Sequence, residues 1–104
     1  MSPTNGQSAI RIFDLAGEFA EDKDVARSIR TDRILPALGA GKKITLDFSR
    51  VAVATQSFVH ALISEALRLH RERALQLLEF KSCKPAVKSV VLTVVEYSLE
   101  AIKA

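Results

Sequence analysis

The hydrophobic period of the sequence changes within the stretch ITLDFSRVAVATQSFVHALISEAL, Ile44–Leu67. Over Ile44–Phe48 apolar and polar residues alternate, which is the period of two expected of a strand with one buried face. From Ser57 to about Glu72 the apolar residues recur every three or four positions, as on one face of an amphipathic helix. The polar tripeptide Thr55-Gln56-Ser57 stands at the junction. The stretch therefore predicts a strand, an exposed loop and a helix in succession.

The segment before this stretch predicts another strand and another helix. Ala9–Ala16 (AIRIFDLA) is rich in apolar residues and reads as a strand ending at Gly17, with a fourth strand around Glu18 and Phe19 that would pair with it as a hairpin. A helix is expected to begin near Asp22 or Asp24, because a carboxylate there can accept hydrogen bonds from free backbone amides.

The end of that helix is marked by proline and glycine. Pro36 lacks a backbone N–H and crowds the preceding turn, so we expect a break near residues 33–35. The glycines of Gly39–Gly41 then supply a flexible stop.

The segment after the opening stretch predicts a third strand, Ala74–Phe80, and a final helix. The last 20 residues are rich in β-branched side chains, but Val87, Val90, Val91 and Val94 repeat at helical spacing and Pro85 suits a first helical turn. The order strand-helix-strand-helix-strand-helix predicts a small α/β domain with a parallel or mixed sheet of three to four strands and three main helices.

Composition sets further bounds. A hydrophobic fraction of 48% and a charged fraction of 26% are those of an ordinary globular protein. We expect a flexible tail over residues 1–8 and a single domain over residues 9–104. No apolar run approaches the roughly 20 residues that span a bilayer, and the N-terminus does not resemble a secretory signal. A single cysteine, Cys83, allows no internal disulfide. These features predict a cytoplasmic protein without a membrane segment.

Residues that could carry chemistry are sparse. His60 and His70 lie on one predicted helix about 15 Å apart, so they cannot share an ion, and we expect no metal site and no cofactor. Ser57 and His60 are three residues apart and leave open a small hydrolase or transferase, although no carboxylate is evidently placed to orient the histidine.

Net charge is low. The formal value is +3, and most cations are interleaved with acidic residues. The densest basic cluster contains Arg68, Arg71 and Arg73 and leaves weak nucleic-acid binding open. Because the net charge is low, this is the least favoured alternative.

The stretch ITLDFSRVAVATQSF resembles the STAS superfamily, the anti-sigma-factor-antagonist and sulphate-transporter domain, and most closely its small bacterial group of STAS-like domains of unknown function. In that superfamily a strand with a hydrophobic-Leu-Asp-hydrophobic pattern, here Thr45-Leu46-Asp47-Phe48, precedes a helix that opens Asp-Ser-Ser-Gly. Those four positions fall on Thr55, Gln56, Ser57 and Phe58. In the antagonists a partner kinase phosphorylates the first serine, whose place is taken here by Gln56; Thr55 and Ser57 keep hydroxyl groups.

The resemblance implies a non-catalytic regulatory module of bacterial signalling. Its partner would be a histidine-kinase-like ATPase domain or an anti-factor, and its contact surface would comprise Arg50, Thr55, Gln56, Ser57, His60 and Ser64. Two alternatives stay open from the residues themselves. In the first, the tripeptide caps the helix and has no further role. The second concerns the valine-rich helix Val87–Val95, which either fills the core or supports a homodimer.

Overall fold

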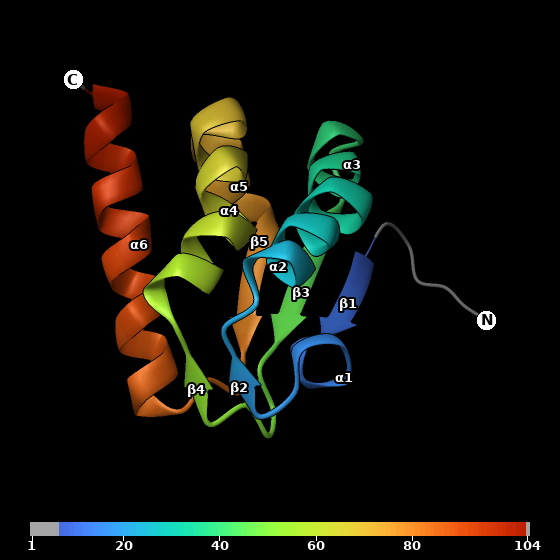
Figure 1. The fold of residues 1–104 in the computed structure, drawn as a ribbon. Coiled ribbons are helices and arrows are strands. Elements are labelled where there is room, and N and C mark those ends of the chain that lie inside the picture. The colour runs from blue at the N-terminus through green and yellow to red at the C-terminus, as the bar shows by residue number, and fades with distance from the viewer. Residues whose placement is uncertain (1–6, 104) are drawn as a thin grey trace.

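Three strands pair side by side in one parallel sheet (Figure 1). The structure, a computed structural model, describes the backbone of residues 7–103 and the side chains of residues 9–100. Strands β1 (Gln7–Arg11) and β5 (Leu78–Lys81) flank the central strand β3 (Lys43–Asp47), and both run parallel to it. The predicted α/β class and the parallel sheet are confirmed.

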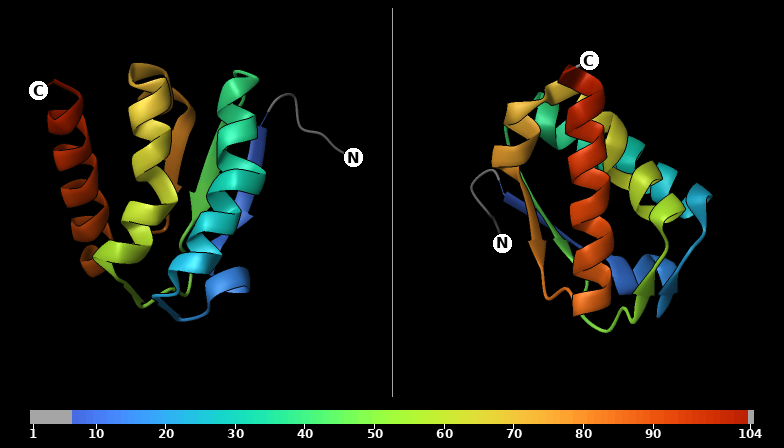
Figure 2. Two further views of the ribbon diagram at one scale, coloured as in Figure 1. Left: turned by 45° about the horizontal axis from the view of Figure 1, so that its top comes forward. Right: turned by 90° about the vertical axis from the view of Figure 1, so that its left-hand side faces the viewer.

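Helices lie on one side of this sheet (Figure 2). Alternation along β3 sends Ile44 and Leu46 into the core, both 0% exposed. Thr45 and Asp47, on the opposite side of the strand, are only half-buried. There the Thr45 hydroxyl donates a hydrogen bond of 3.0 Å to the carboxylate of Glu79 on β5. The sheet therefore has one apolar face and one polar face.

The first strand ends earlier than predicted. Of the expected strand Ala9–Ala16, the part after Arg11 is instead a short helix, α1 (Ile12–Ala16). Adjacent apolar residues at Ile12 and Phe13 break the period of two that a strand needs. Gly17, at a φ of 80°, donates its amide to Phe13 O at 2.9 Å and so closes the helical turn.

The fourth strand is present, but its partner differs from the prediction. Strand β2 (Phe19–Ala20) pairs in parallel with β4 (Val53–Ala54) in a separate two-stranded sheet, not with β1 as a hairpin. Helix α1 stands between β1 and β2, so the chain cannot turn back directly onto the first strand. The opening stretch therefore contains a second short strand between β3 and the following helix.

The next helical run begins and breaks near the predicted positions. Helix α2 (Lys23–Ile29) is capped by Asp22, whose carboxylate accepts a hydrogen bond from Asp24 N at 2.8 Å. A π-helical segment, η1 (Arg30–Ile34), then leads into α3 (Leu35–Gly39). Pro36 has no N–H for the usual bond to the carbonyl four residues back. The irregular turn falls just before it, as expected.

The second half of the chain contains two long helices. Helix α4 (Gln56–His70) and helix α6 (Pro85–Lys103) confirm the two helix predictions. Between them, α5 (Glu72–Leu77) occupies the first part of the predicted strand Ala74–Phe80, so β5 begins only at Leu78. Alanine, leucine and glutamine favour helix, which explains the later start of the strand.

One apolar core unites these elements. Its largest fully buried side chains are Phe48, Phe58, Ile12, Ile34, Leu38, Ile44, Leu46, Leu62, Ile63, Leu67, Val51 and Val59. Residues 1–6 of the predicted tail lie outside the described part of the chain, and Gln7 and Ser8 already belong to β1.

A hydrogen-bonded turn ends β3. The carboxylate of Asp47 accepts bonds from both the hydroxyl and the backbone amide of Ser49. The hydroxyl first, and then the amide, lower the pKa of Asp47, and the charges of Lys81 and Arg11 act in the same direction. The turn therefore stabilises the charged form of this carboxylate.

We predict that Ser49→Ala destabilises the fold in a pH-dependent way. Because the pKa of folded Asp47 is lowered, its bonds to Ser49 contribute stability above the pKa of the unfolded carboxyl, and this is lost as pH falls through the folded pKa. Urea unfolding should show a cost below about 1 kcal/mol near pH 7 for this half-buried, partly screened pair, and the cost should shrink toward about pH 3. The control Ser28→Ala, on α2, should show no such dependence on pH. If Ser49→Ala cost the same near pH 7 and near pH 3, its stabilising bond to the charged Asp47 carboxylate would be contradicted.

Candidate functional site

The polar tripeptide at the start of α4 has two separate roles. Thr55 is half-buried and caps the helix, because its hydroxyl accepts a hydrogen bond from Phe58 N at 3.2 Å. Its own amide donates to Ala20 O at 3.0 Å, which ties the start of α4 to β2. Gln56 and Ser57 are exposed. The cap is thus made by one residue, and the other two are available to a partner.

An open groove of about 560 Å³ lies beside this helix start. Four helical segments contribute to it: α2, η1, α4 and α6. Its lining residues are Lys23, Arg27, Arg30, Gln56, Ser57, His60, Ala61 and Tyr97. The groove therefore combines several basic side chains with hydroxyl, amide and aromatic groups.

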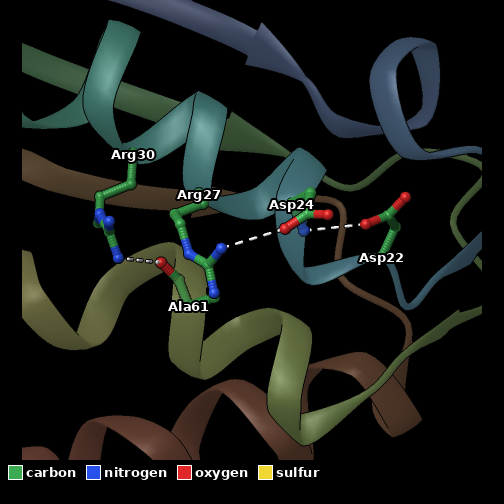
Figure 3. A network of polar contacts seen from close by, with 5 residues as sticks. All are labelled: Asp22, Asp24, Arg27, Arg30 and Ala61. Carbon is green, nitrogen blue, oxygen red and sulfur yellow. Dashed lines mark hydrogen bonds and ion pairs between the residues drawn. The ribbon is translucent and has the colours of Figure 1, made fainter.

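A basic stripe on α2 and η1 forms one wall of the groove. Lys23, Arg27 and Arg30 are spaced four and three residues apart, which places them on one helical face. Figure 3 shows both arginine side chains extending toward α4. Arg27 lies 3.1 Å from Asp24, and Arg30 donates to Ala61 O at 3.4 Å. This stripe was not predicted, because its cations are interleaved with acidic residues in the sequence.

His60 and Tyr97, which both line the groove, contact each other directly. The Nδ1 atom of His60 lies 2.8 Å from Oη of Tyr97, and the two rings stack with centroids 5.7 Å apart. This contact joins α4 to α6 over 37 residues of sequence. No short motif signals such a pairing, although Tyr97 is the single tyrosine of the chain.

Ser57 and His60 do not form a nucleophile–base pair in this arrangement. Among the described residues the hydrogen bonds of the His60 side chain lead to Tyr97 alone, and none joins it to Ser57 or to a carboxylate. A general base that activates a serine needs such a bond and an orienting group. The geometry thus offers binding groups more readily than a nucleophile.

Three of the six predicted contact residues, Arg50, Thr55 and Ser64, are not part of the groove lining. Arg50, at a φ of 70° in the turn after β3, places its guanidinium 4.4 Å from the ring centroid of Phe13. Ser64 is half-buried further along α4. Gln56, Ser57 and His60 line the groove together, and Thr55 precedes them in sequence as the cap of α4.

The cluster proposed for nucleic-acid binding lies at the other end of α4. Arg68 pairs with Glu65 at 3.3 Å, and Arg71 and Arg73 follow the helix terminus. All three are exposed. They are therefore separate from the basic stripe of the groove.

The described residues contain neither a cluster of metal ligands nor a membrane-spanning helix. Over that part of the chain, no group of three or more histidine, cysteine or acidic side chains is placed to hold a metal ion. Nor does any helix there have the length and apolar character needed to cross a membrane.

The parallel sheet, covered by helices on one side, and the groove at the start of α4 belong to one small α/β domain. A family model described as STAS-like domain of unknown function (DUF4325) matches residues 26–88, and the chain belongs to this family. No curated protein and no solved structure shows a significant match. The matched region includes Arg27, Arg30 and the groove residues of α4, whereas Lys23 and Tyr97 lie outside it.

We predict that Thr55→Ala costs about 1 kcal/mol of unfolding free energy, the usual value of a lost N-cap. Thr55→Ser keeps the capping oxygen and should retain most of the stability that the cap contributes. The matched control is Thr93→Ala at an exposed position of α6, where the hydroxyl bonds only to Ser89 O within the same helix. That change should be neutral or slightly stabilising, because alanine favours helix. Urea unfolding followed by circular dichroism measures all three, and an equal loss in Thr93→Ala would contradict the capping role.

Proposed function

We propose that this chain is a non-catalytic regulatory module that binds a protein partner through the first two turns of α4. The proposed contacts are Gln56, Ser57 and His60, with Arg50, Thr55 and Ser64 as outlying parts of the predicted surface. One observation carries the proposal: Thr55 meets the capping requirement alone, which leaves exposed polar groups beside an open groove. Membership of the STAS-like family supports a regulatory role.

The partner proposed from the STAS resemblance is a histidine-kinase-like ATPase domain or an anti-factor in the cytoplasm. Directional hydrogen bonds from Gln56 and Ser57 would set the register of such a complex, and the basic stripe on α2 would attract an acidic surface. Cations at an interface act mainly on the rate and selectivity of association. An acidic partner surface is therefore the best electrostatic match for this face.

Phosphorylation, if the family's switch operates here, falls on Ser57. Gln56 has no hydroxyl group, and the Thr55 oxygen is occupied in the cap. Ser57 is exposed and shares the groove with Lys23 and Arg27. A phosphate at the second residue of α4 would gain from the nearby cations and from the positive end of the helix dipole.

We predict that Gln56→Arg and His60→Glu each reduce partner capture by about tenfold or more, equivalent to about 1.4 kcal/mol. Arginine adds bulk and charge at the rim, and glutamate introduces a carboxylate into the groove. Tagged protein would be used to capture partners from extracts of the source cell, with quantitative mass spectrometry as the readout.

The matched control for this capture is Gln76→Arg, the same change at an exposed position of α5. It should capture the same proteins as the unmodified chain. Equal capture by all variants would remove the assigned surface.

We predict that incubation with the same extract and ATP adds one phosphate to the chain, located on Ser57. Intact mass gives the stoichiometry, and fragmentation gives the position. Ser57→Ala should abolish the added mass, whereas Ser89→Ala, at an exposed serine of α6, should not. Phosphate that persists in Ser57→Ala would assign the modification elsewhere.

A further inference from the structure

The cations of the groove are weakly neutralised within the chain. Over the described residues no carboxylate lies within 4.0 Å of the Lys23 ammonium group. Arg27 has a partner in Asp24, but the side chains are 54% and 85% exposed. Water screens such a pair strongly, so an incoming anion can displace Asp24 at little cost.

Arg30 is largely buried, and its hydrogen-bonding capacity is only partly used. Its side chain is only 19% exposed, and its nearest carboxylate, on Glu65, is 3.8 Å away. Its Nε atom is buried without a hydrogen-bond partner, and its bond to Ala61 O is long at 3.4 Å. A guanidinium held away from water normally requires full pairing. This one has donor capacity left over.

We propose that the groove binds the phosphate group of a phosphate monoester. Lys23 offers a point charge, Arg27 and Arg30 offer planar forks that suit phosphate oxygens, and the Ser57 hydroxyl can donate a further bond. A carboxylate carries one negative charge, whereas a monoester near neutral pH carries close to two. Three cations on one wall of the groove therefore match a phosphate monoester better than a carboxylate.

The inference deepens the proposed function and rests on it where the phosphate belongs to the partner, since it names the group that the partner inserts. The same chemistry can also come from a small phosphorylated molecule. A groove of about 560 Å³ accommodates either one modified side chain or a compound of modest size. In the second case the stacked rings of His60 and Tyr97 offer a flat wall for an aromatic part.

The test is a titration of the isotopically labelled chain followed by amide and arginine side-chain resonances. The probes are N-acetyl-O-phosphoserine amide, for a partner side chain, and adenosine monophosphate, for a small phosphorylated molecule, with sodium chloride at matched ionic strength as reference. We expect saturable shifts at Gln56, Ser57 and Arg27, with a dissociation constant on the order of 1 mM or tighter for the better probe.

Variants decide whether the basic stripe is responsible. Lys23→Gln and Arg27→Gln remove exposed charges without disturbing the core and should each weaken binding about fivefold or more. Arg73→Gln makes the same charge change at an exposed position of α5, beyond the far end of α4, and should leave the constant unchanged. Arg30→Gln, which alters a largely buried group, is not needed for the conclusion.

Either probe binding through the stripe supports the site, and the tighter one identifies the source of the phosphate. Shifts no larger than those of sodium chloride, or equal weakening by Arg73→Gln, would overturn the inference. Failure of the two proposals can be told apart, because the titration needs no partner. If the groove binds phosphate but Gln56→Arg and His60→Glu capture partners normally, only the partner surface is refuted. If the two variants lose partner capture but the groove does not bind phosphate, only the phosphate site is refuted.

Discussion

The pairing of β2 with β4 sets the starting points of the helices that form the groove. Each strand has two residues, and each leads directly into a helix: α2 follows β2, and α4 follows β4. The bond from Thr55 N to Ala20 O continues the ladder up to the first residue before α4. Because Ala20 and Ala54 are small and buried, the two strands can lie close under the helices. This short sheet, together with the contacts of Arg30 with Ala61 and Glu65 on α4, fixes the basic stripe relative to the polar tripeptide.

The parts of the fold that could be predicted are those with a long, regular pattern. Alternation over Ile44–Phe48 and the helical stripe of α4 follow from burial of one face, and burial is the dominant energy term. Asp22 acts through its own carboxylate, and Pro36 acts through its missing N–H, so both effects are local and can be predicted from the sequence. The two-residue strands carry no period at all. Their pairing depends on tertiary contacts between positions 34 residues apart, Phe19 and Val53.

The candidate site was predictable to the same extent. The α4 half lies on one continuous stretch, so Gln56, Ser57 and His60 were found together. The α2 half escaped because its cations alternate with acids in sequence, although spacing by four and three sends them to one face. Tyr97 could be placed only by the packing of α6 against α4. Sequence reasoning finds groups that share an element and misses those that only the assembled fold brings together.

The two phosphate proposals compete for the same cations. Phosphate on Ser57 would lie at the start of α4 and draw Lys23 and Arg27 toward itself, because an attached anion has a high local concentration beside them. A ligand phosphate would then meet cations that are already neutralised, and a second negative charge that repels it. Modification of Ser57 would therefore release a phosphate-bearing partner. Under these proposals the exposed serine and the under-neutralised arginines form one switch, in which a covalent phosphate displaces a bound one.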